Sequence, residues 1–356
     1  MRQRGRPGAL GLSMAALAAL VLAATWTPSA ASSAEAQGIG VPRNWGYQLQ
    51  GYDLAALGDS MFEVLVIDYS TSGGAGGELT PEQVRALRED GPCGKRIVLA
   101  YLSIGEAEDY RYYFESSWLG PGNQPAAGAP PWLGATNPDW EGNYKVRYWQ
   151  RGWQRILWGT RSGADRSYLD RIIDAGFDGV YLDIIDAFEY WGPRENGGND
   201  EKRDSARAMV AFVRKLAKYA RRTRGAKNFL VVPQNGAGLI ADWSYPDSAD
   251  PGKEAAKQRR RYFRTIDAIA AEDVFHSGNR DENNAYRPRK PRLQLLDQFG
   301  VAGKSVLVVD YLTDQQKIDR FWSEAESRGY LPYVARRDLD RLTIPSGHAP
   351  ACRRPQ

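Results

Sequence analysis

Histidine and cysteine are scarce in this chain, which has two of each among 356 residues. With only His276 and His348 available, neither a histidine-rich metal centre nor a Ser-His-Asp set can be assembled. Cys93 and Cys352 have no histidine beside them, so a zinc site is disfavoured. In an exported protein these cysteines could form one disulfide that pins the C-terminal tail, although sequence alone does not show that they meet.

An excess of charge of one sign is also lacking. The chain has 47 lysines and arginines against 43 acidic residues, a formal net charge of +4. No basic stripe typical of nucleic-acid binding is present, and the run 259–261 is interpreted as a solvated helix face. We therefore expect no nucleic-acid partner, no cofactor and no metal ion, and we expect a monomer.

Only one long apolar run occurs, at about 9–24. It follows Arg2, Arg4 and Arg6 and precedes a small-residue cleavage pattern at 34–36. The run is short for a membrane-spanning helix, so an uncleaved anchor is disfavoured. The pattern predicts a signal peptide over residues 1–36, a secreted or periplasmic location, and no membrane contact beyond the export signal.

Eight short apolar runs alternate with helical or long connecting segments. They lie at 44–50, 64–69, 96–106, within 176–186, and at 229–236, 268–273, 305–311 and 330–335. This order predicts an α/β fold, a single (β/α)8 TIM barrel over residues 37–340 with a C-terminal tail over 341–356. An open doubly wound sheet is the alternative, but no Gly-rich phosphate-binding turn follows the first strand.

A long aromatic-rich loop is expected after the third strand, over residues 110–158. Its prolines and glycines between 120 and 138 predict mostly irregular structure. The loop contains Trp118, Trp132, Trp140, Trp149, Trp153 and Trp158. Some of these rings could be platforms for sugars, but at least half of them are expected to form the loop's own core.

The stretch 176–186 resembles a buried parallel strand whose carboxyl end opens into a reactive site. By strand alternation, Tyr181 and Asp183 share one face and Val180 and Leu182 the other. An acid at the end of a buried strand is expensive to desolvate unless partners or chemistry retain it. The ordinary alternative is that Asp183 or Asp186 caps the next helix.

Polar side chains recur at the carboxyl ends of the other predicted strands. They are Gln48, Asp68, Tyr69, Ser103, Glu106, Gln234, Asn235, Glu272, Asp273, Asp310 and Tyr311. No lysine lies at a strand end, which disfavours a Schiff-base aldolase. A magnesium site built from Asp68, Asp183 and Asp310 stays open as an alternative. Acids combined with aromatic rings favour a glycosidase, because glycosidic cleavage needs two carboxyl groups.

Seven motifs resemble glycoside hydrolase family 114, the endo-α-1,4-polygalactosaminidase group and its related bacterial TIM-barrel proteins. They are 45–50 (WGYQLQ), 66–70 (VIDYS), 100–108 (AYLSIGEAE), 146–149 (VRYW), 179–183 (GVYLD), 233–236 (PQNG) and 309–311 (VDY). The resemblance runs from about residue 44 to 336. It implies a (β/α)8 barrel, export, and hydrolysis of galactosamine-containing polysaccharide.

The resemblance also implies roles for particular residues. Asp183 is the expected nucleophile, which implies retention at the anomeric carbon, and Glu272 is the expected proton donor. Asp273 is the alternative donor, but Glu272 shares a strand face with the small residues Ala268 and Ala270. The expected substrate-binding residues are Asp68, Tyr69, Tyr101, Ser103, Glu106, Tyr181, Asp186, Gln234, Asn235, Asp310 and Tyr311.

The expected rim carries many acids and almost no bases, so its potential should be negative. This favours a polysaccharide with free amines over an acidic uronate chain. We expect Glu272 to stay protonated at working pH and Asp183 to be ionised. A different class of function stays open: a non-catalytic polysaccharide-binding barrel that serves an exopolysaccharide system.

Overall fold

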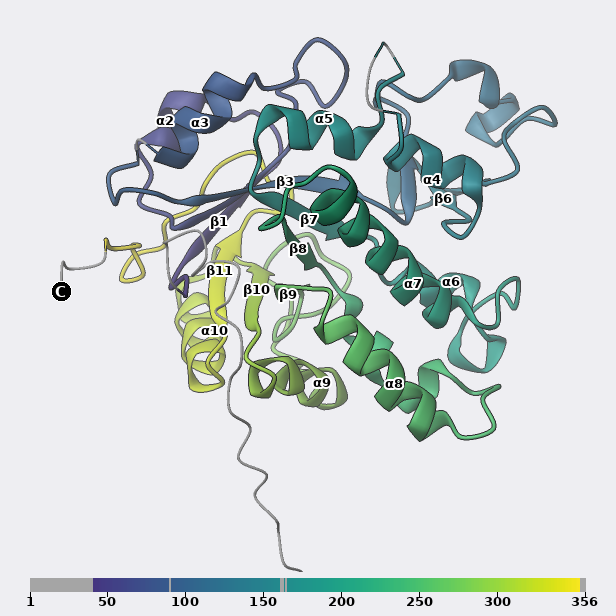
Figure 1. Ribbon diagram of the computed structural model, residues 1–356. Coiled ribbons are helices and arrows are strands. Elements are labelled where there is room, and N and C mark those ends of the chain that lie inside the picture. The colour runs from purple at the N-terminus through teal and green to yellow at the C-terminus, as the bar shows by residue number, and fades with distance from the viewer. Residues whose placement is uncertain (1–40, 90, 161–162, 164, 353–356) are drawn as a thin grey trace, which may run out of the picture. The chain divides into compact units, whose positions relative to one another are not determined.

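The computed structural model describes residues 41–89, 91–160, 163 and 165–352 (Figure 1). The predicted signal peptide therefore lies outside the described residues. Each of the eight predicted strands is present, and none differs from its expected position by more than a few residues. They are β1 (Trp45–Gln48), β2 (Val64–Ile67), β3 (Ile97–Ser103), β7 (Gly179–Asp183), β8 (Leu230–Pro233), β9 (Ala268–Glu272), β10 (Ser305–Tyr311) and β11 (Leu331–Ala335).

The strands form two parallel sheets in chain order, β1-β2-β3-β7-β8 and β9-β10-β11. Two backbone hydrogen bonds link β8 to β9, from Asp267 N to Val231 O (3.0 Å) and from Asn235 N to Ala270 O (2.9 Å). On the other side, Trp45 Nε1 of β1 donates to Leu331 O of β11 (2.9 Å). The structure thus shows the predicted α/β fold, while closure of the strands into one barrel stays a prediction.

Helices follow most strands and lie on the outside of the sheets, as α7, α8, α9 and α10 do in Figure 1. Their bounds are α2 (Leu54–Gly58), α3 (Pro81–Glu89), α4 (Arg151–Leu157), α5 (Tyr168–Ala175), α6 (Ala187–Trp191), α7 (Ser205–Lys218), α8 (Pro251–Phe263), α9 (Lys290–Val301) and α10 (Gln315–Ser327). At the start of α3, Thr80 and Gln83 form a reciprocal capping box. Gly176 ends α5 in the left-handed conformation (φ 86°) and turns the chain toward β7.

The apolar spacing over about 200–222 predicts one helix. The observed helix α7 begins later, at Ser205, and it continues into a π-helix, η4 (Tyr219–Thr223). The buried face of α7 carries Met209, Val213 and Leu216 at helical spacing, as the sequence pattern predicts.

The aromatic-rich loop is more regular than the sequence indicates. It contributes β5 (Leu133–Asn137) and β6 (Trp140–Val146) to the antiparallel sheet β4-β6-β5, whose third strand, β4 (Glu106–Glu108), lies just before the loop. Trp118, Trp132, Trp149, Trp153 and Trp158 pack against the core, whereas Trp140 is 51% exposed. These five tryptophans are therefore packing residues, and some of them, such as Trp158 against Phe212 of α7, pack against helices outside the loop.

The C-terminal tail covers the junction between β1 and β11. Leu339 O accepts from Leu49 N (2.8 Å), and Thr343 N donates to Tyr333 Oη (3.0 Å). The His348 ring stacks on Trp322 of α10. Cys352 then forms a disulfide with Cys93, the pairing that the sequence left open. In the described part of the chain, no helix is long and apolar enough to cross a membrane.

Replacing both cysteines with serine should lower the free energy of unfolding by about 2–4 kcal/mol, because the disulfide closes a long loop in the unfolded chain. Chemical denaturation of the double variant and the wild type, each with and without a reducing agent, measures this difference. The reducing agent should affect only the wild type. An unchanged denaturation midpoint would contradict the prediction.

Candidate active site

A cleft of about 660 Å³ opens at the carboxyl ends of the parallel strands. Both predicted catalytic carboxylates line it, Asp183 from the end of β7 and Glu272 from the end of β9. Four predicted binding residues line it as well: Asp68, Tyr101, Gln234 and Tyr311. The carboxyl-end rule for parallel α/β folds therefore locates the cleft correctly.

Asp183 is held by two donors. Tyr101 Oη donates to Asp183 Oδ2 (2.8 Å), and Ile184 N donates to Asp183 Oδ1 (2.8 Å). Burial, and next the nearby charge of Glu272, raise the pKa of Asp183 well above its ordinary value, and the two hydrogen bonds only partly oppose this. The pKa of Asp183 thus shifts in the direction opposite to the one expected for a carboxylate that stays ionised.

Glu272 is positioned by residues from three neighbouring segments. Asn235 Nδ2 donates to its Oε1 (2.8 Å), and Tyr311 Oη donates to its Oε2 (2.7 Å). Arg337 Nη1 lies 3.8 Å from the same Oε2. Behind the cleft, Arg292 donates to the Glu272 carbonyl (2.8 Å) and to Asn235 Oδ1 (2.5 Å). Asn235 therefore positions Glu272 and does not itself line the cleft.

Asp273, the alternative proton donor, is directed elsewhere. It pairs with Arg337 (Oδ2 to Nη2, 2.9 Å) and is not among the residues that line the cleft. Burial raises its pKa to about 6 even though Arg337 opposes the shift. The geometry favours Glu272 over Asp273 as the carboxyl group that faces the substrate.

Three neighbouring strands leave the rim through a residue with positive φ. These residues are Ile184 (55°) after β7, Asn235 (61°) after β8 and Asp273 (50°) after β9. Left-handed backbone is uncommon outside glycine, and for a β-branched residue such as Ile184 it is a true outlier. Such conformations persist where the surrounding structure enforces them, which often happens at functional sites.

Gly105 lies against Ile184 and leaves room for this conformation. Ile104 N donates to Asp183 O (3.1 Å), so the two chain segments touch. A Cβ on Gly105 would overlap the Ile184 carbonyl and lie 2.6 Å from Ile184 Cγ2. Only glycine permits this close approach.

The Gly105→Ala variant should therefore displace Ile184 and with it the amide that holds Asp183. We expect kcat to fall on the order of 10²-fold, the effect of a small misplacement of a catalytic group. Gly300→Ala, in open space on α9, is the matched control and should keep wild-type kcat. Equal kcat for both variants, with unchanged circular dichroism, would contradict this role of Gly105.

A buried arginine joins two acids at one side of the cleft. Arg111 is fully buried and contacts Asp68 (Nη2 to Oδ2, 2.8 Å) and Glu108 (Nε to Oε2, 2.7 Å). All three side chains line the cleft. Burial raises the pKa of Asp68, and Arg111 opposes that shift.

Other residues predicted to bind substrate do not line the cleft. Ser103 Oγ donates to Glu106 O (3.0 Å), and the Glu106 carboxylate accepts from Asn137 (2.9 Å) and Asn143 (3.3 Å) of the antiparallel sheet. Asp186 is the N-cap residue of α6, but its side chain accepts no capping hydrogen bond. Burial raises the pKa of Asp186 to about 7. Their roles in substrate binding stay predictions.

Tyr69, Tyr181 and Asp310 also lie away from the cleft lining. The Tyr69 ring packs against Tyr168 of α5, and the Tyr181 ring packs against Trp45 of β1. Asp310 accepts from Val274 N (2.7 Å) and His276 N (2.8 Å) and so shapes the loop after β9. Among the described residues, no three or more histidine, cysteine or acidic side chains converge as metal ligands, so Asp68, Asp183 and Asp310 do not form the alternative magnesium site.

Sequence reasoning missed several residues of the cleft. Arg111 comes from the aromatic-rich loop, Glu108 from β4 just before it, and Arg337 follows β11. Trp140, one of the rings named above as a candidate platform for sugars, does line the cleft. Applying the strand-end rule to the eighth strand would have found Arg337, whereas no sequence signal indicates that Arg111 is buried.

The charged lining of the cleft is predominantly acidic, as expected, although the rim contains two bases that the sequence pattern did not indicate. The acids are Asp68, Glu108, Glu141, Asp183, Glu272 and Asp338, and the bases are Arg111 and Arg337.

Comparison with known proteins identifies the family of the chain. A model of glycoside hydrolase family GH114 matches residues 23–353. An uncharacterized protein of Methanocaldococcus jannaschii is 36% identical over 307 residues, which cover 84% of this chain and 77% of that protein. An uncharacterized protein of Thermotoga maritima is 36% identical over 318 residues, which cover 86% of this chain and 85% of that protein.

A similar fold is found in the glycoside hydrolase domain of PelA from Pseudomonas aeruginosa. The TM-score is 0.54 at 19% sequence identity, and the match covers 85% of this chain and 98% of that domain. At this identity the likeness concerns the fold alone. Because the family model spans residues 23–353, the chain belongs to glycoside hydrolase family GH114, as its motifs predict.

Proposed function

We propose that this glycoside hydrolase cleaves α-1,4-linked galactosamine-containing polysaccharide in an endo-acting, retaining reaction. The observation that carries the proposal is that Asp183 and Glu272 line one cleft, from the ends of two strands separated only by β8. Two carboxyl groups that face the same space are the minimum that glycosidic cleavage requires.

In the proposed reaction, Glu272 donates its proton to the leaving glycosidic oxygen while Asp183 attacks the anomeric carbon. The C–O bond breaks and a glycosyl ester forms on Asp183. Glu272, now ionised, then removes a proton from a water molecule that attacks the ester and releases Asp183. Tyr101 would orient the nucleophile, and Asn235 and Tyr311 would orient the acid.

The raised pKa of Asp183 supports an amine-bearing substrate. Burial and the charge of Glu272 favour a protonated Asp183 in the free enzyme, whereas attack requires the ionised form. The ammonium group of a galactosamine unit at this position would lower that pKa, because an opposite charge favours the carboxylate. The substrate would thereby help to ionise its own nucleophile, and the excess of acids in the cleft would attract it.

This proposal is tested with de-N-acetylated α-1,4-galactosamine oligosaccharides, their fully acetylated counterparts, and polygalacturonate. We expect cleavage of the first, weaker cleavage of the second, and none of the third. The acid limb of kcat/KM, which reports the free enzyme, should lie at higher pH than that of kcat, which reports the complex. A preference for polygalacturonate, or coincident acid limbs with the amine substrate, would contradict the proposal.

A binding function without cleavage is the second candidate. The acids and aromatic rings that line the cleft would serve a binding site as well as a catalytic one. A pull-down with the polysaccharide, combined with a long incubation that measures new reducing ends, separates the two functions. Binding without any release of reducing ends would support the second candidate.

We also propose that the protein is exported and that its eight strands close into one barrel. The disulfide between Cys93 and Cys352 supports an oxidising compartment. The backbone hydrogen bonds between β8 and β9, and the contact of Trp45 with β11, support closure.

A further inference from the structure

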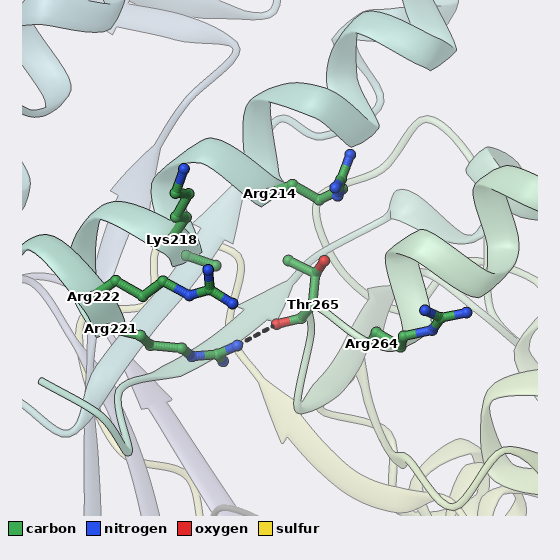
Figure 2. A pocket seen from close by; sticks show the side chains of 7 residues that line it. Arg214, Lys218, Arg221, Arg222, Arg264 and Thr265 are labelled. Carbon is green, nitrogen blue, oxygen red and sulfur yellow. Dashed lines mark hydrogen bonds between the residues drawn. The ribbon is translucent and has the colours of Figure 1, made fainter.

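A second pocket, of about 380 Å³, lies outside the cleft where α7 and α8 end. It is here named the basic pocket, and its lining residues are Arg214, Ala217, Lys218, Arg221, Arg222, Arg264 and Thr265. Figure 2 shows Arg214, Lys218, Arg221 and Arg222 on the α7 side and Thr265 and Arg264 opposite. Thr265 precedes β9, so the basic pocket lies near the end of that strand remote from Glu272.

One of its five cations is already paired. Arg221 donates to Asp267 Oδ2 (2.5 Å) and to Thr265 O (2.8 Å), the bond drawn in Figure 2. The other four make no side-chain hydrogen bond or ion pair within the described part of the chain. Arg214, Lys218 and Arg222 follow one another at intervals of four residues, and like charges at that spacing destabilise a helix.

The helix dipoles account for only part of this charge. The carboxyl end of each helix carries the equivalent of roughly half a negative charge, which favours nearby cations. The two helix ends at the basic pocket together offset about one of the four unpaired cations. A strong excess of positive charge therefore remains.

The backbone here is unusual as well. The π-helix η4 extends α7, and Arg224 N donates to Tyr219 O, five residues back (2.9 Å). Single π-turns occur frequently at functional sites. This one carries both Arg221, which pairs with Asp267, and Arg222, which lines the basic pocket.

We propose that the basic pocket is a second, non-catalytic binding site for phosphate groups. Arginine and lysine are the residues that bind phosphate oxygens, and several unpaired cations suit a ligand with more than one negative charge. The volume lies within the roughly 300–1,000 Å³ range of small-ligand sites. Ala217 is the one apolar side chain of the lining, so binding would rest on charge and not on insertion of an acyl chain.

The test compares the wild type with Lys218→Gln/Arg222→Gln. The control, Arg194→Gln/Lys253→Gln, removes the same charge from two exposed residues elsewhere. Binding of inorganic phosphate and of pyrophosphate to each protein is measured by calorimetry and by thermal shift. Co-sedimentation of each protein is measured with phosphatidylcholine vesicles that contain or lack phosphatidylglycerol. We expect saturable binding of pyrophosphate to the wild type and the control, at least tenfold weaker binding to the pocket variant, and weakening with salt.

Each outcome bears on the proposal. Binding of the free anions alone supports a soluble or polymer-borne phosphate, and co-sedimentation only with phosphatidylglycerol supports a lipid head group. Equal weakening in the control, or no saturable binding of any probe by the wild type, would overturn the proposal. A lower Tm of the pocket variant without any anion binding by the wild type would assign these cations to helix stabilisation alone.

Discussion

The Asp183→Asn and Glu272→Gln variants should lose nearly all hydrolysis of the polysaccharide. Without the Asp183 carboxylate no glycosyl ester can form, so kcat should fall at least about 10⁴-fold, as when other covalent nucleophiles are removed. The Glu272→Gln variant loses the general acid, which contributes about 10²–10⁴-fold. Reducing-end release under identical conditions, with circular dichroism to verify folding, measures both effects.

Asp273→Asn is the matched control, because Asp273 is adjacent to Glu272 but pairs with Arg337 outside the cleft lining. We expect it to keep most of the activity. If it abolishes cleavage while Glu272→Gln does not, Asp273 is the proton donor. Wild-type activity in both folded Asp183→Asn and Glu272→Gln would refute the two-carboxylate assignment.

The Asp183→Asn variant should also be more stable than the wild type at neutral pH. A carboxyl group whose pKa is raised by folding destabilises the native state once the pH exceeds its unfolded value, and the penalty grows up to the folded pKa. A neutral amide removes that penalty.

The second large effect is expected for Arg111→Met. The variant leaves Asp68 and Glu108 buried without their shared cation, and breaking a buried ion pair in this way costs about 3–5 kcal/mol. Urea denaturation measures the loss. Arg194→Met, which breaks an exposed pair with Asp200, is the control and should cost about 0–1 kcal/mol.

The loss in Arg111→Met should depend on pH. Burial already raises the pKa of Asp68, and removal of the guanidinium raises it further, so the ionised carboxylate becomes more destabilising. The loss of unfolding free energy in Arg111→Met should therefore be larger at about pH 7.5 than at about pH 5. The triple variant Arg111→Met/Asp68→Asn/Glu108→Gln should recover part of it. A deficit no larger than the control's, at both pH values, would contradict the buried-pair account.

The positions of the strands and of the cleft follow from the amino-acid pattern alone. Apolar runs such as Val64–Ile67 can only be buried, and their polar ends must meet where parallel strands end. Strand alternation also carries information about which polar residues face away from the cleft. Tyr311 points at Glu272, so Asp310, its neighbour in β10, lies on the opposite face. The two-residue period separates such neighbours, but only the structure shows which of them faces the cleft, because Tyr181 shares a strand face with Asp183 and still lies away from the lining.

Which polar residues complete the cleft follows only from the way the chain packs. Arg111 contacts Asp68, which lies 43 residues away in the sequence. Arg337 approaches Glu272 from the segment that follows β11. Glu106 also follows a predicted strand, yet two asparagines of the antiparallel sheet occupy its carboxylate. Alternation and turn signals are local, whereas these pairings depend on the paths of long connections, which only the packing of the whole domain determines.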